Sequence, residues 1–174
     1  MRFLFILGIS KVYINFERTD MSTRAIQFLK QKKITFEVVK YDHEEKGAEF
    51  AARASGYPLE RTVKTLVVDL GKKQYALVLM PGDKQLSMKR LAKIQRLKRA
   101  AMADTRTAER LTGYLVGGIS PFGTRQKLPV VMEESILKFE SILINAGQRG
   151  TMLLMAPQDI KTAVVAQVAR IADL

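Results

Sequence analysis

Two β-rich runs stand close together near the middle of the chain, and they restrict the fold more than any other feature. Residues 62–70 and 74–80 are rich in valine, leucine and threonine or aromatic residues, and only Gly71, Lys72 and Lys73 separate them. A short loop that contains glycine between two such runs indicates a β-hairpin. The chain therefore contains a sheet that is built around at least one antiparallel pair.

Shorter segments on both sides of this hairpin predict interspersed helices and strands. Helices are expected over residues 23–32, 48–55, 104–111 and 157–172, in the segment after Ser87, and as one turn over 133–138. Further strands are expected over residues 36–41, 99–102, 128–132, 141–145 and 151–155. Short strands in hairpins with helices between them predict an α+β fold with a mixed, strongly curved sheet.

The composition places the chain among single globular domains. It has 174 residues, 47% of them hydrophobic, which is enough to build a core without disulfide or metal staples. Cysteine is absent, which excludes disulfides, zinc–thiolate sites, iron–sulfur clusters and a cysteine nucleophile. With one histidine as well, we expect no metal and no cofactor. A reducing, cytoplasmic location is consistent with this usage.

The first 20 residues differ from the rest of the chain. Residues 3–9 are apolar, but the run is far shorter than the ~20 residues of a membrane span, and no convincing cleavage site follows it. Helical spacing begins only after Met21, where Ser22 or Thr23 can cap a helix. We therefore expect an N-terminal extension over 1–20, one domain over 21–174, and no membrane partner.

The charge is strongly basic and concentrated in one segment. Lysine and arginine number 29 against 17 acidic residues, a net charge of +12, and residues 84–110 hold nine basic and two acidic residues. If Ser87 caps a helix, Lys89, Lys93 and Arg96 share one face of it at i, i+4 and i+7 spacing. Such a stripe suits the phosphate backbone of a nucleic acid, although a solvated helix face is an equal alternative.

A glycine-rich loop over residues 113–123 contains the sequence GGISPFG from Gly117 onward. Consecutive main-chain N–H groups in such a loop can bind a phosphate, a carboxylate or a developing oxyanion, and a structural turn is the alternative. The loop matches neither GxGxxG nor a P-loop. Ser120 has no evident base, because the only histidine is His43, for which we expect a surface position.

Lys64 lies inside the first of the two central runs, between Val63 and Thr65. A lysine there points either to solvent at a sheet edge or into a pocket, since lysine is almost never buried without a partner. The residue pattern alone favours solvent. In a pocket, its charge would bind a phosphate or polarise a carbonyl.

Six short motifs in order resemble the YbaK/EbsC family. They are YxH at 41–43, VKTL at 63–66, MAD at 102–104, TGYLVGGISPFG at 112–123, LP at 128–129 and GxRG at 147–150. The resemblance covers residues 21–174, and it extends to the free-standing Cys-tRNA(Pro) deacylases of that family. It implies a barrel-like curved sheet with surrounding helices, removal of a wrong amino acid from the 3′ end of tRNA(Pro), and prolyl-tRNA synthetase as a further candidate partner.

The resemblance also assigns residues of the site. Lys64 would hold the terminal nucleotide or the aminoacyl group, and the amides of Gly117 and Gly118 would stabilise the ester carbonyl. Pocket walls would come from Tyr41, Thr65, Ile119, Ser120 and Asn145. For the tRNA backbone, the charge pattern described above indicates Lys89, Lys93 and Arg96 as the contacts. The family uses no protein side chain as a clear general base. If the cysteinyl thiol attacks its own carbonyl, the reaction is formally a cyclising elimination; otherwise it is a hydrolysis.

Three positions depart from the family pattern and leave the substrate open, and the segment from Glu44 to Phe50 is shorter than is usual in the family. Asn145-Ala146-Gly147 stands where Cys-specific members have Ser-Gly-Gly, and Met152 stands where they have aspartate. Cysteine remains the first expectation, with alanine or serine as alternatives. A non-catalytic RNA- or nucleotide-binding module of the same fold is the third hypothesis.

Overall fold

The structure is a computed structural model that describes residues 13–14, 22–42, 45 and 47–173. Most of the predicted 1–20 extension, and His43, lie outside the described residues. Within the extension, Tyr13–Ile14 (β1) pairs antiparallel with Glu37–Lys40 (β2).

The described residues form five α-helices and nine strands, with two short 3-10 helices. The helices are α1 (Arg24–Gln31), α2 (Ala48–Ser55), α3 (Met88–Ile94), α4 (Thr105–Thr112) and α5 (Pro157–Val164), and the 3-10 helices are Leu59–Arg61 and Glu134–Lys138. The remaining strands are β3 (Thr62–Gly71), β4 (Gln74–Pro81), β5 (Ala101–Met102), β6 (Val130–Glu133), β7 (Ile142–Gln148), β8 (Thr151–Met155) and β9 (Gln167–Ala169).

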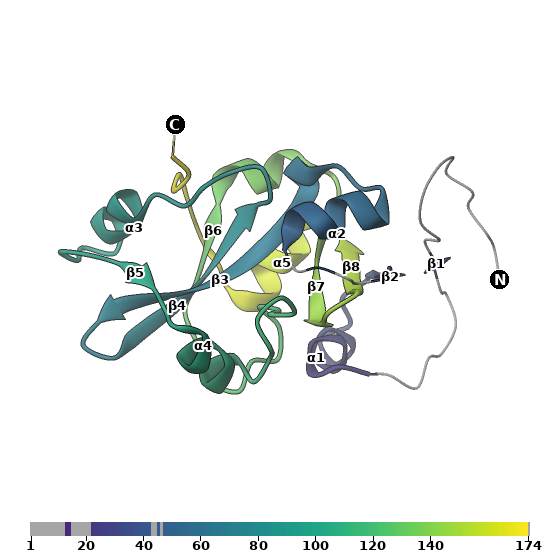
Figure 1. The fold of residues 1–174 in the computed structure, drawn as a ribbon, viewed down its shortest axis with the longest axis horizontal. Coiled ribbons are helices and arrows are strands. Elements are labelled where there is room, and N and C mark those ends of the chain that lie inside the picture. Colours follow the sequence, from purple (N-terminus) through teal and green to yellow (C-terminus); the bar gives the residue numbers. More distant parts are fainter. Residues whose placement is uncertain (1–12, 15–21, 43–44, 46, 174) are drawn as a thin grey trace.

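All nine strands belong to one mixed sheet (Figure 1). Their order is β1-β2-β8-β7-β3-β4-β6-β9, and β5 pairs with β3 beside this path. The β3–β4 and β7–β8 pairs are antiparallel, whereas β3–β7, β4–β6 and β6–β9 are parallel. The predicted α+β fold with a mixed sheet is confirmed.

Helices cover the two faces of the sheet unequally. Alternate strand residues point to opposite faces, so Val67 and Leu77 belong to one core and Val68 and Val78 to another. Helices α1, α4 and α5 pack on the first face. On the second face, α3 covers one end through Leu91, and α2 covers the β2–β8–β7 end.

Several predicted boundaries agree with the structure because they rest on local caps. Thr23 caps α1 by accepting a hydrogen bond from the N–H of Ile26 (3.2 Å), and Asp104 caps α4 by accepting one from Thr107 (2.8 Å). Helix α2 begins and ends at the predicted residues, and Gly56 terminates it in the left-handed conformation.

The predicted C-terminal helix over 157–172 is wrong in its second half. Helix α5 ends at Val164, and Val165 takes a left-handed φ of 52°. The chain then forms β9, which extends the sheet beside β6. Val168, in the middle of β9, is β-branched and suits a strand, and a helical pattern in the sequence cannot reveal a free sheet edge at β6.

Glu133 fixes the C-terminal segment that follows β9. Its side chain is buried (2% exposed), and one carboxylate oxygen accepts hydrogen bonds from the N–H groups of Ile171 (2.7 Å) and Ala172 (2.8 Å). The other oxygen accepts from the N–H of Ser135 at 3.4 Å. A buried carboxylate therefore takes the place of a strand partner for these N–H groups.

Candidate functional site

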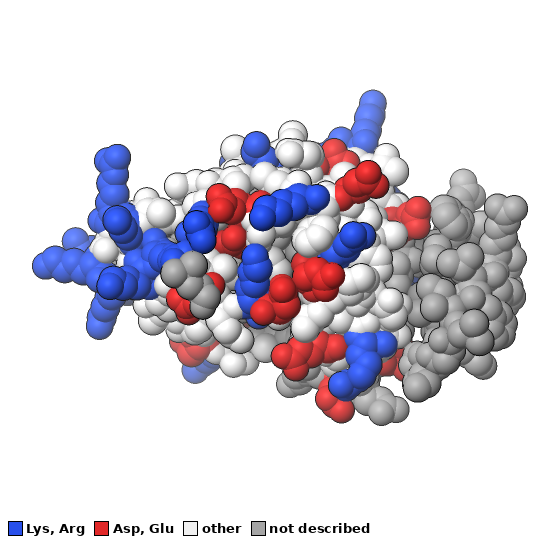
Figure 2. Space-filling view, turned by 90° about the horizontal axis from the view of Figure 1, so that it is seen from above, with Lys and Arg blue, Asp and Glu red and all other residues white. Residues whose placement is uncertain are grey.

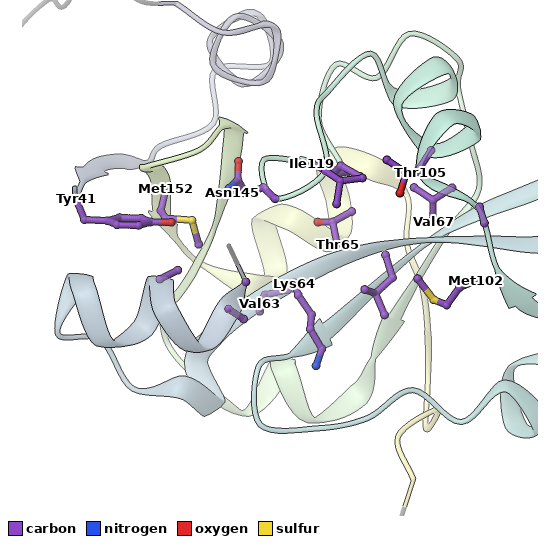
Figure 3. Close-up of a pocket in the computed structure, with 18 residues that line it drawn as sticks. Tyr41, Val63, Lys64, Thr65, Val67, Met102, Thr105, Ile119, Asn145 and Met152 are labelled. Atoms are coloured by element: carbon purple, nitrogen blue, oxygen red, sulfur yellow. Dashed lines mark hydrogen bonds between the residues drawn. The ribbon is translucent and has the colours of Figure 1, made fainter. Parts of the chain in front are cut away.

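The site is a cavity at a gap in the pairing of β3. On one edge, β3 pairs with β7 at Thr62 and Val63 and with β5 at Val68 and Asp69. Among the described residues, no strand pairs with this edge between those two points. A cavity of about 420 Å³ lies there, and Figure 3 shows its lining side chains. Helix α2, the start of α4, the 113–123 loop and the β7–β8 hairpin complete its walls.

Lys64 lies in the lining of this cavity, half-buried, and not at a solvated edge. It points to the opposite face of β3 from Thr65 (Figure 3), and its Nζ donates a hydrogen bond to the carbonyl oxygen of Gly82 at 3.3 Å. Burial lowers the pKa of its ammonium, while Glu49 and Asp83 act in the opposite direction. The site thus contains a desolvated cation beside the gap.

Thr65 is the polar group in the centre of the gap. Its Oγ1 is buried, and it has no hydrogen-bond partner among the described residues. A buried hydroxyl without a hydrogen-bond partner destabilises the folded state by about 1–3 kcal/mol. Such a group is unusual in a folded protein unless a ligand supplies the partner. The N–H of Ala103 donates to the carbonyl of Val67 (3.0 Å), so the main-chain groups of Thr65, two residues away, face the same open edge.

Hydrogen bonds within the glycine-rich loop and from the β7–β8 hairpin hold this loop in place. The hydroxyl of Tyr114 donates to the carbonyl of Phe122 (2.6 Å), and burial raises the pKa of this tyrosine. From the β7–β8 hairpin, Arg149 donates to the carbonyl of Val116 from both Nε (3.1 Å) and Nη2 (2.6 Å). The loop is therefore held rigidly at the cavity wall.

Within this loop, the predicted oxyanion donors need a correction. Gly117, with a φ of 93°, and Ile119 line the cavity. Gly118 does not line it, because its N–H donates to the carbonyl of Leu115 (2.9 Å) in a turn. A Cβ on Gly118 would lie 3.1 Å from the main-chain nitrogen of Arg149, so this glycine allows the loop and the hairpin to approach closely.

Ser120 and Asn145 have structural roles in this arrangement. Ser120 is fully buried outside the cavity lining, and its Oγ accepts a weak hydrogen bond from the N–H of Phe122 (3.4 Å). Asn145 does line the cavity, but its Nδ2 donates to the carbonyl of Gly117 (3.3 Å) and its Oδ1 accepts from the N–H of Gly147 (2.8 Å). Asn145 therefore positions the loop.

Tyr41 and Met152 form the end of the cavity opposite β5 (Figure 3). Both are nearly buried, and burial raises the pKa of the Tyr41 hydroxyl, which stays protonated at neutral pH. This end is apolar and polarizable, because the thioether of Met152 stands where a carboxylate was expected from the resemblance.

Sequence reasoning missed lining residues at both ends of the cavity, since α2 packs at the end of Tyr41 and Met152 and β5 forms the other end. Met102, Ala103 and Thr105 line the cavity from β5 and the start of α4, and Ala48 and Ala51 line it from α2. The motif at 102–104 marked the first of these segments without giving it a role. No sequence signal could have identified the alanines, because an alanine on a helix does not indicate whether it faces a cavity or the core.

The predicted basic stripe is partly assembled by the structure. Ser87 is the N-cap of α3, although its side chain makes no capping hydrogen bond, and Lys89 and Lys93 are exposed on the helix. Arg96 does not continue that face, because α3 ends at Ile94 and Arg96 takes a left-handed φ of 55°. A hollow nearby is lined by Arg90, Lys93, Ile94 and, from the C-terminal segment, Arg170.

The described residues contain neither a metal-binding cluster nor a membrane-spanning helix. No group of three or more histidine, cysteine, aspartate or glutamate side chains there could hold a metal ion. None of the helices in this part of the chain has the length and apolar character that a membrane crossing requires.

Comparison with known proteins agrees with this architecture. Residues 42–163 match the family model described as the aminoacyl-tRNA editing domain. This match spans most of the chain, so the chain belongs to the aminoacyl-tRNA editing domain family, and the resemblance to the YbaK/EbsC proteins is confirmed. The family consists of deacylases that act on aminoacyl-tRNA, and this protein is an editing enzyme of that class.

Relatives with different substrates are similar to this chain. A candidate Cys-tRNA(Pro)/Cys-tRNA(Cys) deacylase, EbsC, of Enterococcus faecalis is 30% identical over 157 residues, which cover 89% of this chain and 96% of that protein. The Ser/Thr-tRNA deacylase ProXp-y of Escherichia coli is 30% identical over 141 residues, which cover 78% and 83%. A solved structure of a candidate trans-editing enzyme for prolyl-tRNA synthetase has the same fold, with a TM-score of 0.81, 23% identity and coverage of 91% and 100%.

Proposed function

We propose that this protein removes a wrongly attached amino acid, mainly cysteine, from tRNA(Pro) in trans. The observation that carries the proposal is the gap in β3, where a hydroxyl and main-chain groups without partners among the described residues stand beside a half-buried cation. A cavity of about 420 Å³ is in the range of small-molecule sites, so it is suited to an aminoacyl group with part of the terminal nucleoside.

Each part of the site has a role in this proposal. Lys64 supplies positive charge to a phosphate of the 3′ end or to the ester carbonyl, and Gly117 and Ile119 bring loop main chain to the carbonyl. Thr65 and the open edge of β3 bind the polar atoms that all α-amino acids share. Tyr41 and Met152 surround the side chain, and their apolar surface favours a thiol or methyl group over a hydroxyl.

The reaction needs no protein nucleophile. In hydrolysis, a water oxygen bonds to the carbonyl carbon, the ester C–O bond breaks, and the 3′ oxygen of the tRNA takes a proton. In the cyclising alternative, the cysteinyl sulfur bonds to the carbonyl carbon, the same ester C–O bond breaks to release a cyclic thioester, and the thiol proton goes to the 3′ oxygen of the tRNA. In both cases the protein contributes orientation and charge stabilisation.

On the tRNA, the proposal places exposed basic residues against the phosphate backbone. Lys89 and Lys93 on α3 and Arg96 after it would make these contacts, with Arg90 and Arg170 around the adjoining hollow. Phosphate contacts do not read sequence, so selection of tRNA(Pro) would need a further partner, for which prolyl-tRNA synthetase is the candidate.

The test of substrate is deacylation of a panel of charged tRNA(Pro). We expect Cys-tRNA(Pro) to be deacylated fastest and Ala-tRNA(Pro) next, with Ser-tRNA(Pro) slower by at least about tenfold, because one extra buried hydroxyl without a partner costs 1–3 kcal/mol. A faster reaction with serine would instead identify a Ser deacylase. Binding of tRNA without turnover of any substrate would identify the non-catalytic module.

Thr65→Val tests the role of the unpartnered hydroxyl. Valine has the same shape, so we expect the free energy of unfolding to stay constant or to rise by about 1 kcal/mol, because a buried hydroxyl without a partner is removed. The value of kcat/KM should fall by about tenfold or more, because the substrate loses a hydrogen bond. Urea unfolding measures the free energy of unfolding, and deacylation measures kcat/KM. A loss of activity that is accompanied by a decrease in the free energy of unfolding would show that the hydroxyl is structural.

A further inference from the structure

The turn of the β3–β4 hairpin contains residues that are conformationally strained at their positions. Lys72 and Lys73 form a two-residue loop in which both φ angles are positive, 52° and 60°. This is the φ signature of a type I′ turn, for which Asn-Gly is the favoured pair because side chains with a Cβ are strained there. Two consecutive lysines therefore occupy these positions against the conformational preference.

Other basic residues come to the same place. Strand β5 runs antiparallel to β3, with Ala101 opposite Asp69, so the residues before Ala101 run toward the turn. These residues are Lys98 and Arg99, and both are exposed, as are Lys72 and Lys73. We call these four the hairpin cluster. Residues 84–103 contain seven basic residues and no acidic one.

The cluster lies at one end of an otherwise mixed surface. In Figure 2 basic side chains dominate the left end of the molecule, where Figure 1 shows α3, β5 and the hairpin turn, whereas the middle of that face carries both signs of charge. Near the turn, β3 contributes one acidic residue, Asp69, whose Oδ1 accepts from the N–H of Gly71 (2.7 Å), against the four basic residues of the cluster. The positive field at this end is therefore little compensated.

The hairpin cluster lies at a distance from the cavity, because β3 extends from the cavity to the turn. Lys72 follows Thr65 by seven positions in the sequence, which at about 3.3 Å per position corresponds to about 23 Å along the strand. An aminoacyl group in the cavity would place the single-stranded 3′ end of a tRNA near β3 and β5. The paired part of the molecule would then reach the hairpin turn.

From this geometry we propose that the hairpin cluster docks the double-stranded acceptor stem of tRNA through its phosphates. This inference rests on the proposed function for the position of the 3′ end. The turn projects from the sheet, and its lysines would bind the sugar–phosphate backbone without base-specific contacts. The turn is strained because two lysines, and not the favoured turn residues, occupy the tip of the hairpin, and this places two ammonium groups there.

The test is the double variant K72N/K73G, which keeps the turn and removes both charges. We expect its Tm to rise by about 2–4 °C, because the favoured turn residues relieve strain. Its affinity for uncharged tRNA should fall by about tenfold, and the slope of log K against log salt should become shallower by between 1 and 2. Its kcat/KM should fall for full-length aminoacyl-tRNA but not for a short single-stranded aminoacyl oligonucleotide ending in CCA.

The matched control is K32N/K33G. Both lysines are exposed at the end of α1, Lys33 also has a positive φ (57°), and the change in net charge is the same. We expect tRNA affinity within twofold of the unaltered protein. Equal loss of affinity in both double variants would overturn the inference in favour of a general charge effect. Failure of the unaltered protein to deacylate any substrate would remove the proposed function, while the binding data would still test the docking surface.

Discussion

Replacing Lys64 with alanine is expected to lower kcat/KM for Cys-tRNA(Pro) by at least about 100-fold. The side chain lines the cavity and carries the one lysine charge found in that lining, and loss of one such stabilising donor typically costs 10²–10³ in rate. Single-turnover deacylation with excess protein measures the effect directly. Because burial lowers the pKa of Lys64 and so opposes its charge, the free energy of unfolding should not decrease by more than about 1 kcal/mol.

Two further variants decide what the lysine contributes. Lys161→Met removes an exposed lysine of α5 outside the cavity, and we expect the rate to stay within twofold. Lys64→Arg keeps the charge but changes its shape, so partial activity would indicate that charge matters more than geometry. If Lys64→Ala retains activity within threefold of the unaltered protein, the proposed role of Lys64 is wrong.

The largest effect on stability is expected for Glu133→Ala. Its carboxylate accepts hydrogen bonds from the N–H groups of Ile171 and Ala172, which are buried residues. The bridge between Ala172 and Leu86 leaves these two N–H groups without a main-chain acceptor among the described residues. Leaving these N–H groups unsatisfied should lower the free energy of unfolding by about 3–4 kcal/mol, or Tm by about 10 °C. Urea and thermal unfolding measure both quantities.

The neighbouring Glu134 provides the control for this prediction. It is exposed, so Glu134→Ala should change stability by less than about 0.5 kcal/mol. Glu133→Gln keeps an acceptor oxygen and should have an intermediate effect. A loss below about 1 kcal/mol for Glu133→Ala would show that solvent or a rearranged segment satisfies the two N–H groups.

Local signals in the sequence predicted most elements of this fold. The central hairpin, helix α2 and the caps at Thr23 and Asp104 depend on residues that are neighbours in the chain, and they agree with the structure. The pairing of β3 with β7 and of β6 with β9 depends on segments far apart in sequence, which periodicity cannot match. The C-terminal strand β9 was missed for this reason, since only the edge of β6 makes it a strand.

The site was predicted in part for the same reasons. Resemblance to the family selected Tyr41, Lys64, Thr65, Ile119 and Asn145, and all of them line one cavity. It could not distinguish amides that face the cavity from those used inside the loop, so Gly118 and Ser120 were assigned there as well. That distinction depends on single hydrogen bonds, here to Leu115 and Phe122, which only the folded loop defines.

The gap in β3 also has a consequence for self-association. Unpaired donors and acceptors on a sheet edge normally template the addition of another chain, and they are a common origin of aggregation. Here the open stretch spans only the few residues between Val63 and Val68, and α2 and the glycine-rich loop stand on its two sides. A whole strand cannot enter, whereas a molecule the size of one amino acid can. Recognition of main-chain atoms and protection from fibril-like pairing thus depend on the same short length of exposed edge.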